Sequence, residues 1–153
     1  MSKSIAYLNL IRFFNPIGFW LLLWPGLWGL FLSENMDISY FTIVVLGSFL
    51  TRSVGCAIND IIDLQYDKKV ERTKNRPLAN GDLSLKEALI FTVILAAACL
   101  YLLSLTNMQT ICLVLFVAVP MIIIYPLMKR FVSVPQLFLG ATFGLSLPIS
   151  YSM

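Results

Sequence analysis

An asparagine and three aspartates lie close together in the stretch NDIIDLQYD, at the end of an apolar segment. They are Asn59, Asp60, Asp63 and Asp67. If one helix runs through the whole stretch, its step of about 100° per residue puts Asn59, Asp63 and Asp67 at roughly 0°, 40° and 80°, with Asp60 near 100°. All four polar groups then share one face. Carboxylates packed this closely repel one another in an apolar setting, so the pattern predicts a cation beside them.

Two sources of that cation are open. The first is the basic run KKVERTKNR just after the motif, whose lysines and arginines can neutralise the aspartates directly. The second is a metal, because carboxylate and amide oxygens without nitrogen or sulfur ligands suit Mg²⁺, which commonly binds through a few carboxylates, waters and substrate phosphates. In that case Arg72, Lys74 and Arg76 would hold the phosphate charge that the metal bridges.

Arg52 is a further charged residue, and it lies within an apolar segment. It precedes Asn59 by seven positions, which puts it on nearly the same helix face and roughly 10 Å further along the axis. An ionised side chain at membrane depth costs several kcal/mol unless it faces a cavity or a partner, so a functional role is the first interpretation. The alternatives are an ion pair with an aspartate of its own helix and a side chain that extends to the membrane surface.

The elements that position these residues are predicted to be membrane helices. Of the 153 residues 59% are hydrophobic and 12% are charged, and the mean hydropathy is +0.85. A helix needs roughly 17–25 apolar residues to cross a bilayer. Five segments qualify, namely 15–32, 40–58, 88–105, 109–128 and 136–153. The composition therefore predicts an all-α fold, a polytopic transmembrane helix bundle of about five membrane helices.

The basic residues indicate how these segments are oriented. Ten of the 11 lysines and arginines lie before the first segment, between the second and third, or between the fourth and fifth. All these positions fall on one side of an alternating path, and by the positive-inside rule that side is cytoplasmic. The N-terminus and the aspartate-rich motif are therefore expected on the cytoplasmic side.

The connection that follows the motif contains clear turn signals. Pro77 and the pair Asn80-Gly81 predict turns. Ser84 and Glu87 have the spacing of a capping box, so the third membrane helix is predicted to start at Ser84. The sequence shows no repeat and no low-complexity segment. Residues 1–153 are therefore expected to form a single membrane-embedded domain.

The motif NDIIDLQYD resembles the NDxxDxxxD signature of the UbiA family of intramembrane prenyltransferases. The resemblance extends over essentially the whole chain, because further blocks match the 4-hydroxybenzoate polyprenyltransferase branch of that family in order and spacing. The blocks are RFFNPIGFWLLLWPGLWGL, RSVGCAINDIIDLQYDKKVERTKNRPLANG, YPLMKR and VPQLFLGATFGLSLP. An aspartate motif at a helix end followed by KVERTKNRPL is a specific signal, whereas a lone DxxxD would be weak.

The resemblance implies a magnesium-dependent transfer of a polyprenyl group from polyprenyl diphosphate to the ring of 4-hydroxybenzoate, ortho to the hydroxyl, in ubiquinone biosynthesis. The implied location is a bacterial inner membrane, among membrane lipids and with no nucleic acid partner. An allylic diphosphate ionises readily when cations stabilise the leaving group, and the phenol ring is activated by its own hydroxyl. The reaction therefore needs no histidine, and the chain has none.

The resemblance also implies roles for single residues. Asn59, Asp63 and Asp67 are the expected Mg²⁺ ligands, with Asp60 as a support or second ligand. The expected contacts to the diphosphate come from Arg72, Lys74 and Arg76, chiefly from the two arginines.

The other implied roles concern the aromatic acid and the carbocation. Arg130, in YPLMKR, matches an arginine that helps to position the aromatic acid, and Arg52 is a candidate for the same carboxylate. Tyr125 can stabilise the allylic cation with its ring, or can be an ordinary interfacial tyrosine.

The chain departs from the family in one respect. The proteins that it resembles are about twice as long and have a second aspartate-rich motif on a later helix. Asp82 and Glu87 do not replace that motif, because they lie in the same connection as the first one and lack its spacing. The sequence is therefore expected to be truncated, with the second aspartate-rich half absent. Two alternatives stay open: another aromatic or quinone-precursor prenyltransferase of the superfamily, and a non-enzymatic membrane relic.

Overall fold

The computed structural model describes residues 2–34, 37–128 and 135–153, and within them it contains helices and no strand. The helices are α1 (Lys3–Leu10), α2 (Ile17–Leu32), α3 (Ile38–Ile62), α4 (Leu64–Asp67), α5 (Leu85–Ser104), α6 (Met108–Leu113), the π-helical turn η1 (Val114–Ala118), α7 (Val119–Met128), α8 (Pro135–Gly144) and α9 (Ser146–Tyr151). The predicted all-α class is confirmed.

Three helices in the described part of the chain are long and apolar enough to cross a membrane: Ile38–Ile62, Leu85–Ser104 and Met108–Tyr125. They correspond to three of the five predicted segments. The first predicted segment forms the shorter apolar helix Ile17–Leu32. The last is divided at Leu145 into α8 and α9. Pro148 has no N–H for the carbonyl of Gly144, which interrupts the helical hydrogen bonds there. The number of five membrane helices stays a prediction.

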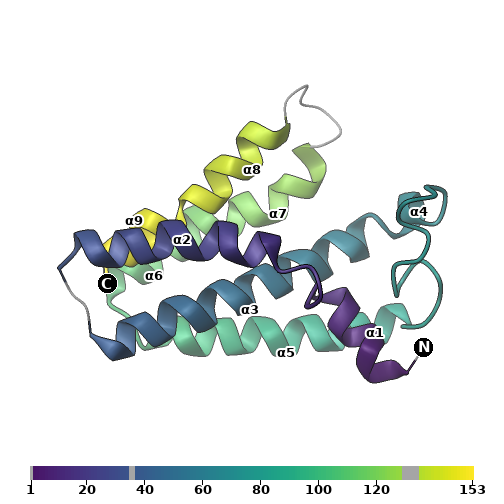
Figure 1. The fold of residues 1–153 in the computed structure, drawn as a ribbon, viewed down its shortest axis with the longest axis horizontal. Coiled ribbons are helices and arrows are strands. Elements are labelled where there is room, and N and C mark those ends of the chain that lie inside the picture. The colour runs from purple at the N-terminus through teal and green to yellow at the C-terminus, as the bar shows by residue number, and fades with distance from the viewer. Residues whose placement is uncertain (1, 35–36, 129–134) are drawn as a thin grey trace.

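The helices pack as one bundle (Figure 1). α3 and α5 run side by side, and α2 packs against both α3 and α9. The hydroxyl of Ser146, the first residue of α9, donates a hydrogen bond of 2.7 Å to the carbonyl oxygen of Leu22 in α2. The N-terminus, α1 and α4 lie at one end of the bundle, and the C-terminus lies at the other.

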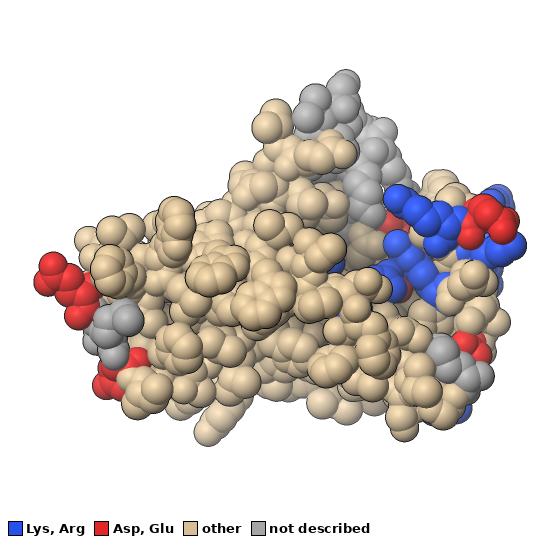
Figure 2. Space-filling view, in the orientation of Figure 1, with Lys and Arg blue, Asp and Glu red and all other residues tan. Residues whose placement is uncertain are grey.

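We call the first of these ends the charged end, formed by α1, α4 and the connection 68–84. Lysines and arginines gather there, beside α4, in the view of Figure 2, whereas uncharged side chains cover most of the rest of that face. An apolar cluster packs at this end of the bundle. It consists of Ala6, Leu10, Ala57, Leu78, Leu83 and Ala88.

The predicted turns and helix start of the connection are confirmed. Gly81 has φ +86°, a left-handed conformation that side chains disfavour. The hydroxyl of Ser84 accepts a hydrogen bond from the Glu87 N–H at 3.2 Å, and the Glu87 carboxylate accepts one from the Ser84 N–H at 2.9 Å. This capping box starts α5 and fixes where the connection enters the bundle.

The aspartate motif does not lie on one continuous helix. α3 continues through Asn59 and Asp60 and ends at Ile62, with Asp63 as its C-cap at φ −87° and ψ 2°. A separate turn, α4, carries Asp67. The single helix assumed for the motif is therefore interrupted at Asp63, although the Asp63 N–H still bonds to the Asn59 carbonyl and the Asp67 N–H to the Asp63 carbonyl, both at 2.9 Å. The bend at Asp63 redirects the chain, so that Asp67 reaches Arg76 in the connection.

Candidate active site

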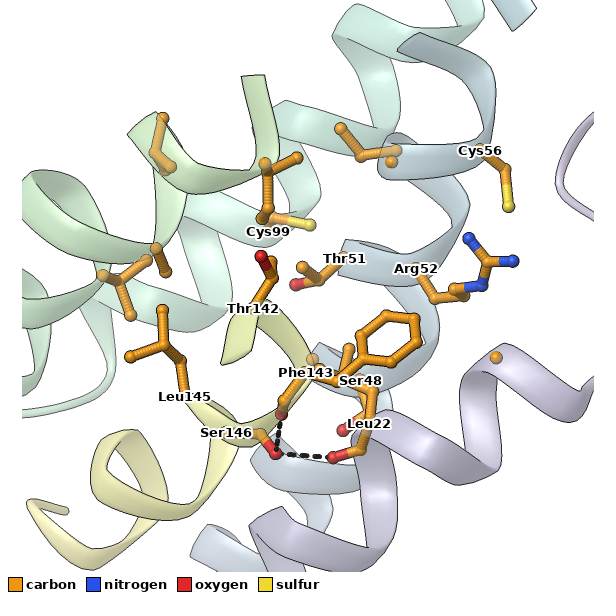
Figure 3. A pocket seen from close by; sticks show the side chains of 18 of the residues that line it. Leu22, Ser48, Thr51, Arg52, Cys56, Cys99, Thr142, Phe143, Leu145 and Ser146 are labelled. Carbon is orange, nitrogen blue, oxygen red and sulfur yellow. Dashed lines mark hydrogen bonds between the residues drawn. The ribbon is translucent and has the colours of Figure 1, made fainter. Parts of the chain in front are cut away.

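A cavity of about 940 Å³ lies within the bundle, with charged groups among its lining residues. Most of its lining is apolar and comes from α2, α3, α5, α8, α9 and the helix 108–125. The polar groups that line it near the charged end are Arg12, Asn59, Asp60, Arg72 and Arg76. The cavity therefore has two chemically different parts, a charged mouth and an apolar interior. Figure 3 shows part of the interior, where Thr51, Arg52, Thr142 and Phe143 come from α3 and α8.

The mouth is organised by a network of two arginines and two aspartates. The side chain of Asp60 is 1% exposed. Arg12 donates from Nη2 to both of its oxygens, at 2.7 and 3.0 Å. Arg76 donates from Nη1 to Asp60 at 3.0 Å and to Asp67 at 2.6 Å. A buried carboxylate is stable only when it is paired and hydrogen-bonded, so these contacts keep the end of α3 in place.

The network answers in part which cation accompanies the aspartates. Arg76 belongs to the basic run and neutralises two carboxylates, as the first alternative expected. In the described part of the chain no group of three or more acidic, cysteine or histidine side chains has the arrangement of a metal site. The oxygens of Asn59, Asp63 and Asp67 nevertheless fit a hard divalent cation in their chemistry, and Asn59 lines the cavity. Asp60 is already paired with Arg12 and Arg76.

The other basic residues of the run differ in their surroundings. Arg72 lines the cavity and is exposed. Lys74 is an exposed side chain that pairs with Glu71 at 2.6 Å, and it is not among the residues that line the cavity. Arg72 and Arg76 are therefore the two residues of the run that face the cavity.

Arg52 lies deeper, on α3, and lines the cavity. Its guanidinium packs against α2 so closely that a Cβ on Gly18 would collide with it. No ion pair joins Arg52 to a carboxylate among the described residues, so the alternative of a pair with an aspartate of its own helix is not observed there. Tyr125 also lines the cavity, and its ring stacks on Phe138 with centroids 6.5 Å apart. Arg130 lies outside the described residues.

Arg12 is the site residue that sequence reasoning missed. In the sequence it counts only as a positive charge before the first apolar segment. Its partner Asp60 is 48 positions away, and no spacing rule connects the two. One structural signal marks the position, because Arg12 has φ +59°, which is uncommon for a residue with a side chain.

Packed apolar helices around a cavity with charged groups at one end define a helical membrane protein. Residues 22–153 match the UbiA prenyltransferase family. The chain therefore belongs to this family, and the resemblance found in the motifs is confirmed.

Several curated relatives of this chain share one name. A 4-hydroxybenzoate octaprenyltransferase of Pasteurella multocida (strain Pm70) is 47% identical over 152 residues, which cover 98% of this chain and 52% of that protein. The proteins of that name from Marinomonas sp. (strain MWYL1) and Vibrio cholerae serotype O1 (strain M66-2) are each 44% identical, over 99% and 98% of this chain and 54% and 53% of theirs. The chain spans about half the length of these relatives.

Solved structures show the same fold. A structure reported for digeranylgeranylglyceryl phosphate synthase in membranes superimposes with a TM-score of 0.81 at 25% identity, and covers 98% of this chain and 53% of that one. A UbiA homologue from Archaeoglobus fulgidus, bound to GPP and Mg²⁺, superimposes with a TM-score of 0.74 at 19% identity, over 97% and 55%. The likeness confirms a membrane prenyltransferase fold.

Proposed function

We propose that this chain acts in the transfer of a polyprenyl group from polyprenyl diphosphate to the ring of 4-hydroxybenzoate, in ubiquinone biosynthesis. The observation that carries the proposal is the charged mouth, with two arginines of the basic run, directly on an apolar cavity. A polyprenyl diphosphate has the same two parts, an anionic head and a hydrocarbon chain. The names of the relatives at 42–47% identity support this donor and acceptor.

Each part of the mouth has a proposed task. The oxygens of Asn59, Asp63 and Asp67 would hold Mg²⁺. Asp60 would support these ligands, because its pairs with arginines keep the end of α3 in place. The bound metal supplies positive charge that stabilises the departing diphosphate. Support for the metal comes from the oxygen donors and from the family neighbour that is bound to GPP and Mg²⁺. Arg72 and Arg76 would hold the diphosphate itself, because planar guanidinium groups match phosphate oxygens in geometry.

The interior has the task of placing the acceptor and excluding water. Arg52 is the proposed partner of the carboxylate of 4-hydroxybenzoate among the described residues, and Arg130 is the alternative from the sequence. Tyr125 would stabilise the allylic cation with its ring face. The apolar walls keep water from that cation, which water would otherwise capture as an alcohol with release of a proton.

The proposed setting is the inner membrane of a bacterium, with the charged end on the cytoplasmic side and residues 1–153 as one membrane-embedded domain. Ten of the 11 basic residues fall on one side of the alternating path, which supports this orientation. Large apolar side chains such as Trp28, Phe31 and Phe116 are exposed and would contact membrane lipid.

The proposal is tested by prenyl transfer to radiolabelled 4-hydroxybenzoate in membranes that contain the chain, with Mg²⁺ or with EDTA. We expect product with Mg²⁺ only, and a loss of about 100-fold in Asp63→Ala, as when one electrostatic group of an active site is removed. Gln65→Ala is the matched control, because Gln65 is an exposed residue of the same motif. Absence of product from a chain shown to be inserted in the membrane would refute the proposed activity for this polypeptide.

A further inference from the structure

The buried carboxylate of Asp60 is shared by two arginines that approach it from distant parts of the sequence. Arg12, between α1 and α2, contacts both carboxylate oxygens, at 2.7 and 3.0 Å. Arg76 contacts one of them at 3.0 Å and also contacts Asp67 at 2.6 Å. The two arginines therefore differ in the number of carboxylates with which they pair. Among the described carboxylates Arg12 pairs with Asp60 only, whereas Arg76 is shared between Asp60 and Asp67.

In the proposed function Arg76 binds the diphosphate, but in this structure its guanidinium is paired with Asp60 and Asp67. Its guanidinium is needed by the diphosphate, and the Asp67 oxygens with which it pairs are needed by the metal. Asp60 has 1% of its side chain exposed, so it cannot lose every cationic partner without a large desolvation cost. Arg76 can leave only if another cation stays with Asp60.

The backbone conformation and contacts of Arg12 suit it to stay with Asp60 as that cation. Its backbone has a left-handed φ of +59°, a conformation that persists in a residue with a side chain only where the surroundings hold it. Its Nη1 donates to the carbonyl oxygen of Asn9 at 3.3 Å. The preceding helix is anchored by Ala6 and Leu10, which are fully buried. Arg12 is therefore a fixed partner of Asp60 and not a mobile surface arginine.

We propose that Arg12 is a positioning residue that holds the Asp60 charge by itself, so that Arg76 can exchange Asp67 for the substrate diphosphate. The inference rests on the proposed function and deepens it, because it makes metal and diphosphate binding cooperative. Both ligands release the same Arg76 to Asp67 contact, the metal by taking the carboxylate and the diphosphate by taking the guanidinium. Each ligand therefore favours the binding of the other, as linkage requires.

The test measures Mn²⁺ binding by electron paramagnetic resonance to the purified chain in lipid nanodiscs, with and without geranyl diphosphate. In the wild type we expect the diphosphate to strengthen Mn²⁺ binding about tenfold, within the ordinary range of coupling between two sites. In Arg12→Gln, Arg76 becomes the sole partner of Asp60, and the strengthening should fall below about threefold. Lys3→Gln is the control, since it removes a charge that pairs with Glu87 outside the cavity.

A double variant separates this role from a merely structural one. Asp60→Asn removes the buried charge, so Arg12→Gln in that background should recover the diphosphate effect. Full coupling in Arg12→Gln alone would overturn the inference, and so would a loss that Asp60→Asn does not rescue. Loss of Mn²⁺ binding in Asp60→Asn by itself would make Asp60 a ligand and also overturn it. A wild-type chain that binds neither Mn²⁺ nor geranyl diphosphate would refute the proposed metal and diphosphate site along with it.

Discussion

The charged end and the membrane-spanning part of this bundle are held together in different ways. At the charged end, Ala6, Leu10 and Ala57 are fully buried, and two arginines pair with the buried carboxylate of Asp60. Along the spans little is buried by the protein itself. Buried residues make up 28% of the apolar window in Ile38–Ile62, and 11% in Leu85–Ser104 and in Met108–Tyr125.

This difference shows which parts of the fold depend on particular side-chain contacts. Side chains at the charged end have particular partners, so a single substitution can remove any one of these contacts. Apolar side chains along the spans lose little when lipid replaces a protein neighbour, because lipid tails are as apolar as leucine. The site uses both properties, since its mouth needs fixed charges and its interior needs only an apolar wall with a few polar groups.

The largest expected effect on stability comes from removing ion pairs of the charged mouth. Arg76→Ala leaves Asp67 without its guanidinium and Asp60 with one arginine. Removing one partner of a buried ion pair costs about 3 kcal/mol of the free energy of unfolding. The measurement is thermal unfolding in detergent.

Lys74→Ala provides the matched comparison at the surface. Lys74 pairs with Glu71, and both side chains are well exposed. Such a pair contributes about 0–1 kcal/mol. If the two variants lost equal stability, the ion pairs of the mouth would not be what holds the charged end.

A smaller effect is expected from displacing one charge in the interior. A Cβ on Gly18 would collide with the guanidinium of Arg52, which must then move within the cavity. If Arg52 holds the carboxylate of 4-hydroxybenzoate, Gly18→Ala should raise the KM for this acid about tenfold, the value of one charge-assisted hydrogen bond. The KM for the polyprenyl diphosphate should stay unchanged, because the mouth is not altered.

Gly140→Ala is the control, because nothing lies within 4 Å of the Cβ position on Gly140. An unchanged KM for 4-hydroxybenzoate in Gly18→Ala would remove Arg52 from acceptor binding and leave Arg130 as the candidate. The substitution thus separates two arginines between which the sequence alone does not choose.

The same contrast explains what the sequence could predict. The apolar lengths of the spans and the cap at Ser84 depend on neighbouring residues, so they are visible in the sequence. The aspartate motif and the basic run were also evident, because their residue types are unusual in an apolar chain. The pairing of Arg12 with Asp60 depends on how α1 folds back onto the end of α3, and no local pattern contains it.

The ends of the helices were harder to predict for a related reason. The break at Asp63 separates Asp67 from the helical face that the spacing predicted. An aspartate is tolerated both in a helix and at its end, so the residue types alone do not choose, and the contact between Asp67 and Arg76 is not visible in the sequence.

The smallest expected effects are two pH dependences at opposite ends of the bundle. At the start of α3 the carboxylate of Asp37 accepts a hydrogen bond from the Ser39 N–H at 2.8 Å, which lowers the pKa of Asp37 below its ordinary value of 3.8. At the charged end, a hydrogen bond to Glu87 raises the pKa of Lys3 above 10.5. The folded state therefore favours the charged form of both groups.

The two contributions to stability disappear in opposite directions of pH. That of Asp37 is present above its unfolded pKa and is lost as the pH falls through its lowered folded pKa, whereas that of Lys3 is present below its unfolded pKa and is lost as the pH rises through its raised folded pKa. The difference in unfolding midpoint between wild type and Asp37→Asn should therefore shrink below about pH 3.8 and stay constant in alkali. For Lys3→Gln it should shrink only above about pH 10.5. Two differences that shrink in the same pH range would contradict the opposite pKa shifts of Asp37 and Lys3.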